Sequence, residues 1–315
     1  MASVYAGHPF NSSFSYPLVL ILVFISLLLC PASAVPRKLA ALVKEPPLVL
    51  RYHAGPLLKG NVTLNLLWYG RFSPSQRAIV VDFLRSLSPT QRSLPLPPSV
   101  SSWWSTTDAY GHGRKTVLFL GRQVLDGGCS LGKSLNSADL VTLAGKAGGG
   151  AAAINVVLTS ADVTVEGFCM SRCGTHGEWR RESPFIWVGN SASQCPGQCA
   201  WPFHQPIYGP QTLPLVAPNG DVGADGMVIN LASMVAATVT NPFKSGFFQG
   251  PKEAPLEAVS ACPGIFGTGA YPGYPGKLMV DSASGSSYNA NGVAGRRYLL
   301  PAMWDPRRSR CTPLV

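Results

Sequence analysis

Signatures of catalytic proteins are scarce in this chain. It has no G-x-S-x-G nucleophile elbow, and the glycine run at 148–150 ends a predicted helix instead of opening one, unlike a phosphate-binding loop. Acidic residues are few, 15 among 315, and no two of them stand at a spacing typical of a glycosidase. We therefore expect no nucleotide cofactor, and the sequence favours a protein that is not an enzyme over a hydrolase.

Charge is missing from the N-terminus. Residues 1–34 contain no Lys, Arg, Asp or Glu, and residues 17–30 form an apolar run in which Ser26 is the one polar residue. Ala32-Ser33-Ala34 follows as a small-x-small cleavage site, so 1–34 are predicted to be a signal peptide; a signal anchor is the alternative. The run is too short to span a bilayer, which needs about 20 residues, and we expect no later segment to be long and apolar enough. The mature protein is predicted to be secreted, without stable membrane insertion.

Removal of an uncharged segment leaves the net charge of +10 on the mature protein. Outside the cell such a surface favours polyanions such as acidic polysaccharides, and nucleic acid is not an expected partner; improved solubility is the alternative explanation. Residues 35–46 are predicted to form a mobile N-terminal arm. Residues 47–315 are predicted to form a single domain, rich in loops because the chain holds 33 Gly and 28 Pro.

Helical and strand patterns alternate along the chain. Ser73, Pro74 and Gln76 give a helix start, and apolar residues at helical spacing follow. The predicted helices cover 74–87, 99–110, 137–146 and 222–240, and the predicted strands cover 61–69, 116–120, 154–158, 277–281 and 297–304. The alternation predicts an α/β or α+β fold with a mixed sheet, flanking helices and a C-terminal half tied by disulfides.

Seven cysteines remain after the signal peptide is removed, and this odd number predicts three disulfides and one free thiol. Spacing favours Cys169 with Cys173, Cys195 with Cys199 and Cys262 with Cys311, and leaves Cys129 as the free thiol. A crossed pairing of the two CxxxC motifs is also sterically possible, and the sequence does not exclude it. Asn61-Val62-Thr63 is a glycosylation sequon, so Asn61 is predicted to carry a glycan.

Each CxxxC motif is followed by a histidine, His176 or His204. Such a set could hold zinc, but thiols of this spacing in an oxidising compartment are usually disulfides, so no metal is expected. The two histidines are polar core residues, sugar contacts or catalytic bases. The candidate ligand-binding residues are His176, Trp201, His204 and Tyr208.

Long strings of the chain resemble the plant EXORDIUM, or phosphate-induced protein 1, family. The strings are GNVTLNLLWYGRFSPSQRAIVVDFL, FCMSRCGTHG, CPGQCAWPFHQPIYGPQTLPLVAPNGDVGADGMVINLA, TVTNPF, EAVSACPGIFG and YLLPAMWDP, within residues 55–315. The resemblance implies an apoplastic, cell-wall-associated protein connected with brassinosteroid-dependent growth and cell expansion, a family without an established biochemical activity. Cys129 lies outside the family pattern, which supports leaving it unpaired.

A second stretch, SMVAATVTNP at 233–242, resembles the helix HELAEAVTDP of microbial metalloproteases. Ser233 and Met234 stand at the His and Glu positions, and neither can bind zinc or act as the general base. The resemblance implies a degenerate metalloprotease-like fold kept as a scaffold. We expect non-catalytic binding of a wall polysaccharide or an extracellular receptor; the alternative is a hydrolase of wall glycans or peptides that uses His176, His204, Asp221 and Asp225.

Overall fold

The computed structural model describes residues 47–111, 113–150, 152–170 and 172–315. The chain divides into two compact units, Met1–Pro47 and Leu48–Val315. The predicted signal peptide at 1–34 and the predicted arm at 35–46 lie outside the described residues. The following description concerns the second unit.

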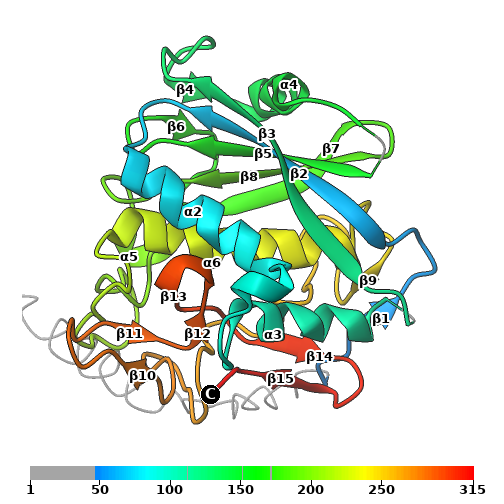
Figure 1. Ribbon diagram of the computed structural model, residues 1–315. Helices are drawn as coiled ribbons and strands as arrows, with labels where there is room; N and C mark the ends of the chain where they lie inside the picture. The colour runs from blue at the N-terminus through cyan, green and yellow to red at the C-terminus, as the bar shows by residue number, and fades with distance from the viewer. Residues whose placement is uncertain (1–46, 112, 151, 171) are drawn as a thin grey trace, which may run out of the picture. The chain divides into compact units, whose positions relative to one another are not determined.

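A five-stranded sheet organises this unit in the order β3-β2-β5-β8-β7 (Figure 1). Its strands are β2 (Gly60–Tyr69), β3 (Thr116–Asp126), β5 (Ala153–Thr159), β7 (Gly174–Arg180) and β8 (Ser183–Gly189). Four of them run parallel, while β7 pairs antiparallel with β8 at the edge. This mixed sheet with its helices confirms the predicted α/β class.

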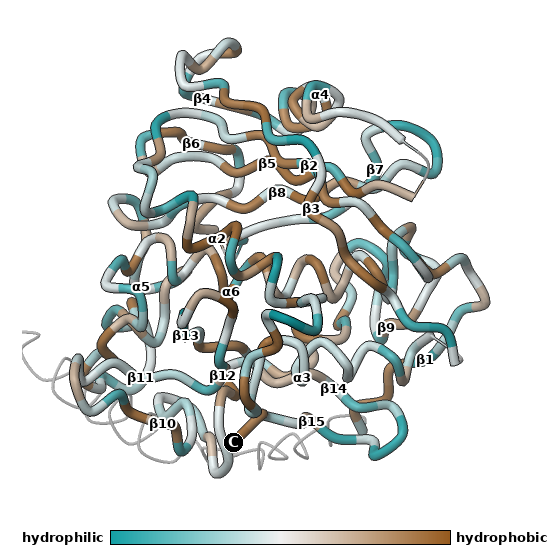
Figure 2. The backbone as a smooth tube through the Cα atoms, in the orientation of Figure 1, coloured by the Kyte–Doolittle hydropathy of each residue, from teal (hydrophilic) through white to brown (hydrophobic). Residues whose placement is uncertain are grey.

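Helices cover both faces of the sheet. Helices α2 (Pro74–Leu87) and α6 (Val222–Thr240) pack on one face with the even-numbered residues of β2, and α4 (Ser137–Ala147) packs on the other with Leu67 and Tyr69. β3 and β5 flank β2 on opposite sides, so right-handed crossovers place the two connecting helices on opposite faces. Strand β2 is therefore buried on both sides, and Figure 2 shows the hydrophobic colouring of β2 and β5.

The starts of α2 and α6 are joined by one side chain. The backbone N–H of Gln76 donates to Ser73 Oγ (3.1 Å) and its side-chain amide oxygen accepts from the Ser73 N–H (3.0 Å), which is the predicted capping box. The Gln76 amide also donates to Asp221 Oδ2 (2.9 Å), while Asp221 Oδ1 accepts from the N–H of Ala224. Asp221 is thus the N-cap of α6, and this contact fixes the two helices relative to each other.

Helix α6 corrects the expectation that no segment after the signal peptide could span a membrane. By length and composition alone it could, since its 19 residues are apolar enough, but 78% of the apolar window is buried inside the fold. It is a core helix, packed against the sheet on one side and the C-terminal segments on the other.

The remaining elements are short. The helices are α3 (Val100–Trp104) and α5 (Pro196–Cys199), and 3₁₀ turns cover Gln91–Ser93, Ser105–Ala109 and Val293–Gly295. The two-stranded ladders pair β1 (Arg51–Tyr52) with β9 (Phe247–Phe248), β4 (Ser134–Leu135) with β6 (Thr164–Val165), β10 (Met279–Val280) with β11 (Ser287–Tyr288), β12 (Ala290–Asn291) with β13 (Arg297–Tyr298), and β14 (Met303–Asp305) with β15 (Arg310–Thr312).

Several elements differ from the sequence predictions. The strand predicted over 116–120 continues to Asp126. The predicted helix over 99–110 is α-helical only to Trp104 and continues as a 3₁₀ turn. The strands predicted over 277–281 and 297–304 are shorter in the structure, where only two- and three-residue strands form in this part of the chain. Pro301 interrupts the second predicted strand, because proline has no N–H to donate. Strands β7 and β8 were not predicted from the sequence.

The disulfides follow the crossed pairing instead of the favoured local one. Cys169 bonds to Cys195 and Cys173 bonds to Cys199, with Cα–Cα distances of 5.7 and 5.4 Å. Cys195 and Cys199 lie one helical turn apart, so both side chains project from the same side of α5 towards the segment that enters β7. The third disulfide, Cys262–Cys311, and the free thiol of Cys129 are as predicted.

Candidate ligand-binding site

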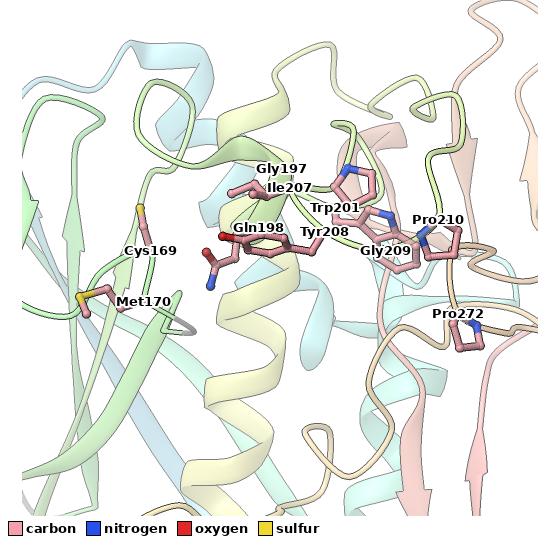
Figure 3. Close-up of a pocket in the computed structure, with 12 residues that line it drawn as sticks. Cys169, Met170, Gly197, Gln198, Trp201, Ile207, Tyr208, Gly209, Pro210 and Pro272 are labelled. Carbon is pink, nitrogen blue, oxygen red and sulfur yellow. The ribbon is translucent and has the colours of Figure 1, made fainter. Parts of the chain in front are cut away.

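A cavity of about 860 Å³ opens beside α5 (Figure 3), and we call it the aromatic groove. Its lining includes Met170, Gln198, Trp201, Tyr208, Pro210 and Pro272. Figure 3 shows Trp201 and Tyr208 on one side and Cys169 with Met170 on the other. The groove therefore brings together two of the four predicted ligand-binding residues, Trp201 and Tyr208.

The loop that carries these aromatics is anchored at its base. Two disulfides tie α5 to the segment before β7, and Trp201 follows α5 at once. A Cβ on Gly197 would lie 2.3 Å from the carbonyl oxygen of Gln205, so only glycine lets the returning loop pack this closely. The Trp201 ring leans against Phe266, with ring centroids 5.7 Å apart. The indole is held in place, whereas Tyr208 is 88% exposed at the rim.

The chemistry of the groove is that of a stacking surface. Its rings and prolines offer flat apolar faces, while the Gln198 amide and the Tyr208 hydroxyl offer hydrogen-bonding groups. No ionisable carboxyl, amine or imidazole is among the described residues that line it. Flat apolar faces with few polar groups suit a sugar ring, whose axial C–H face stacks on aromatics while its hydroxyls hydrogen-bond.

A second cavity of about 660 Å³, which we call the polar pocket, lies between β7, α6 and the loop 253–266. It shares Met170, Gln198 and Trp201 with the aromatic groove, so the two cavities adjoin. Its polar lining includes Arg172, His176, Asn230, Ser233, Lys244 and Glu253. Of the predicted ligand-binding residues, Trp201 and His176 line this pocket.

His176 is the centre of a buried polar cluster at the pocket wall. Its Nε2 lies 3.0 Å from both carboxylate oxygens of Glu257, and both side chains are 8% exposed. The side-chain amide of Asn241 donates to Glu257 Oε1 (2.7 Å), and the backbone N–H of Glu257 donates to Ser260 Oγ (2.8 Å). Asn241 Oδ1 in turn accepts from the Gly246 N–H. The cluster joins β7, the end of α6 and the loop that follows it.

The Nδ1 atom of His176 is buried without a hydrogen-bond partner among the described residues. Nε2 faces the Glu257 carboxylate, so the buried imidazole joins β7 to the loop that follows α6.

His204 and the two aspartates proposed for a hydrolase lie elsewhere. His204 is exposed, and its Nδ1 lies 3.0 Å from the carbonyl oxygen of Gln205. Asp221 caps α6, and Asp225 is buried one turn later, where Asn219 donates to both of its oxygens. Burial raises the pKa of Asp225 to about 7, although the hydrogen bonds from Asn219 oppose that shift. None of the three lines the groove or the polar pocket.

The segment 127–134 (GGCSLGKS) matches the phosphate-loop pattern GxxxxGK[ST], a signal that the sequence prediction left out. In the structure its amides are already used, because those of Cys129 and Ser130 donate to Asp126 and that of Leu131 donates to the hydroxyl of Tyr69. The segment continues into strand β4, and α4 begins only at Ser137. The Asp126 carboxylate accepts from the Ser130 N–H, so these three amides are engaged within the protein and do not form a cradle of free N–H groups.

The metalloprotease-like stretch contributes to the polar pocket. Ser233 and Met234 of α6 line it, and Glu257, from the EAVSAC string, lies at its wall beside His176. Among the described residues no group of three or more His, Cys, Asp or Glu side chains is arranged to hold a metal ion. Glu257 and Asn241 were not predicted as site residues; the only signal was the EAVSAC string, and it gave no partner for His176.

Comparisons with known proteins agree with this sequence resemblance. The model of the phosphate-induced protein 1 conserved region matches residues 50–314. The chain belongs to the EXORDIUM family. It is 62% identical to Protein EXORDIUM-like 2 of Arabidopsis thaliana, over 88% of this chain and 93% of that protein. It is 57% identical to Protein EXORDIUM of Arabidopsis thaliana and 55% identical to Protein PHOSPHATE-INDUCED 1 of Nicotiana tabacum, in each case over 93% of this chain and 97% of the relative.

No solved structure matches the chain. The match at 50–314 covers the whole sheet, both cavities and all three disulfides.

Proposed function

We propose that this protein is a secreted, apoplastic protein of the cell wall that binds an oligosaccharide chain in the aromatic groove without cleaving it. Through this binding it takes part in brassinosteroid-dependent regulation of growth and cell expansion. The observation that carries the proposal is the groove itself, which holds exposed aromatic faces on a loop anchored by two disulfides and has no carboxyl pair among its described lining residues.

Several features support an extracellular carbohydrate ligand. Tyr208 is 88% exposed, and Tyr271 is 65% exposed on the loop that also brings Pro272 to the groove. Exposure of an aromatic ring to water is unfavourable, so a ligand that covers the ring is stabilised. A rigid ring also loses little conformational entropy when a ligand stacks on it. Disulfides persist in oxidising compartments, and Asn61 of the predicted sequon is exposed at the start of β2.

The absence of hydrolysis is supported by the placement of the ionisable side chains. Hydrolysis of a glycosidic bond needs two carboxyl groups on either side of the bond, about 5–9.5 Å apart. Glu257 is engaged by His176 and Asn241, and Asp225 lies buried at the start of α6, so neither faces the groove. One relative, Protein PHOSPHATE-INDUCED 1, is named for induction by phosphate. Neither this name nor that of Protein EXORDIUM gives a substrate.

The test is calorimetric titration of the mature protein with pectic and neutral wall oligosaccharides. We expect Tyr208→Ala and Trp201→Ala each to weaken binding by about tenfold, since stacking on one ring contributes roughly 1–1.5 kcal/mol. Phe119→Ala is the matched control, because Phe119 is an aromatic residue that is 49% exposed on β3, outside the groove. Equal binding by all three variants, or release of reducing sugar ends by the wild type, would contradict the proposal.

A further inference from the structure

The edge strand β7 (Gly174–Arg180) pairs with β8 and with no other strand of the described chain. The N–H of Gly189 donates to the carbonyl oxygen of Cys173 (3.4 Å), so Cys173 turns its polar backbone groups towards β8. In an antiparallel pair this orientation alternates from residue to residue. The residues that turn their N–H and C=O groups away from β8 are therefore Gly174, His176 and Glu178.

The pairing of β7 agrees with this assignment. Glu178 lies opposite Pro184, which has no N–H to donate, as expected for a pair without ladder hydrogen bonds. Of the outward groups, the carbonyl oxygen of His176 accepts a long bond from Thr175 Oγ1 (3.4 Å), and no other hydrogen bond of these groups is present among the described residues. Three outward residues present a ladder edge of about 14 Å, at roughly 3.4 Å per residue.

The first half of this open edge lines the polar pocket, and Glu178 extends the edge beyond it. Gly174 and His176 of β7 line the pocket together with Asn230 and Ser233 of α6. A Cβ on Gly174 would lie 3.2 Å from Met234 Cγ, so glycine keeps the edge close to the helix. Residues of the loop 253–266 line the same pocket. The edge thus opens into a cavity flanked by α6 and this loop, which we call the slot and which admits one extended strand more readily than the flat edge of a second sheet.

The charges at the slot favour an acidic segment. Arg172 and Lys244 line it, and neither forms an ion pair within the described residues. Glu253 is the opposing exposed charge, whereas Glu257 is held by His176. The net charge of +10 attracts acidic partners over a longer range.

We propose that the polar pocket binds an extended, acidic segment of a partner protein, which adds a strand to the open edge of β7. The backbone ladder to Gly174, His176 and Glu178 provides affinity, and Arg172 and Lys244 select an acidic side chain. The His176–Glu257–Asn241 cluster ties the edge strand to the loop that also lines the pocket. Together with the adjoining aromatic groove, this site would join a wall oligosaccharide and a protein on one surface.

The test uses the mature protein and an array of acetylated heptapeptides that carry Val or Thr at alternate positions and one Asp. Dissociation constants are measured by fluorescence anisotropy against two matched sets, one with Lys in place of Asp and one with every second amide N-methylated. We expect the Asp peptides to bind best, and N-methylation to weaken them by at least about tenfold, because each ladder hydrogen bond lost contributes about that factor.

Glu178→Pro removes an outward N–H without touching the ladder to β8, so we expect about a tenfold loss of peptide binding with an unchanged melting temperature. Glu178→Gln, which keeps that N–H, is the matched control and should bind normally. Arg172→Gln with Lys244→Gln should remove the preference for Asp over Lys. Tyr208→Ala should leave peptide binding intact, since Tyr208 lines only the aromatic groove.

Three results would overturn the proposal: no peptide of the array binds, N-methylated peptides bind as well as their parents, or folded Glu178→Pro binds as well as Glu178→Gln. Amide hydrogen exchange provides an independent readout, because peptide binding should slow exchange at 174, 176 and 178. A concentration-dependent dimer that Glu178→Pro abolishes would instead assign the edge to a second copy of the chain and refute a heterologous partner.

Discussion

Removal of the two crossed disulfides gives a quantitative test of how they act together. The Cys169–Cys195 and Cys173–Cys199 bonds each join residues 26 positions apart. In the chain-entropy model, closing a loop of that length contributes about 3.5 kcal/mol to the free energy of unfolding. Once one bond is closed, the other closes only a loop of about eight residues, because its cysteines lie four positions away on each side, and it contributes about 2.5 kcal/mol.

The expected result is therefore not additive. Cys169→Ala/Cys195→Ala should lower the free energy of unfolding by about 2.5 kcal/mol, and Cys173→Ala/Cys199→Ala by the same amount. The quadruple variant should lose about 6 kcal/mol, which is more than the two losses together. Local pairing would close two independent four-residue loops at about 2 kcal/mol each, with additive losses. Urea unfolding at equal pH, followed by fluorescence, measures all three variants.

Peptide mapping of the same protein distinguishes crossed from local pairing directly. Trypsin cleaves after Arg172, between Cys169 and Cys173, and the next tryptic fragments are 173–180 and 182–244. Crossed bonds hold the fragments 147–172, 173–180 and 182–244 in one cluster that separates only on reduction. A disulfide-linked pair of 147–172 with 173–180, with 182–244 released unreduced, would refute the pairing and the stability argument built on it.

Other substitutions test the packing and the buried polar groups. Because burial raises the pKa of Asp225 to about 7, the unfolding free energy of the wild type should fall by up to about 4 kcal/mol as pH rises from 4 to 7; urea unfolding of Asp225→Asn should lack that fall, and an identical pH profile would contradict it. Glu257→Ala removes the buried partner that His176 and Asn241 share, so we expect the free energy of unfolding to fall by about 2–5 kcal/mol in the same assay. A fall of less than 1 kcal/mol would refute the cluster. Gly226→Ala should cost about 1–3 kcal/mol, since a Cβ there would lie 2.7 Å from the Ala200 Cβ, while Gly145→Ala in α4, where the nearest atom is 3.5 Å away, should gain about 0.5–1 kcal/mol in thermal unfolding.

The aromatic groove shows how far sequence patterns reach into the site. Trp201 and Tyr208 were identified from their aromatic character on a proline-punctuated loop, and both line the groove. His204 was chosen because it follows a CxxxC motif, yet it is exposed and does not line the groove, because a loop of irregular backbone has no period from which the side of each residue could be read. His176 lies in the neighbouring pocket, and its partner Glu257 is 81 positions away in the chain.

Local patterns in the sequence were sufficient for the helices α2, α4 and α6, the buried strands β2 and β5, and the family, because capping residues and apolar periods act over a few positions and long strings identify relatives. Only the tertiary structure decided the crossed disulfides, the antiparallel edge strand β7 and the cavities on either side of Trp201. These features depend on which distant segments come into contact after folding. Such contacts are determined by the burial of the sheet faces and by the direction of the crossovers, and not by residue spacing within one segment.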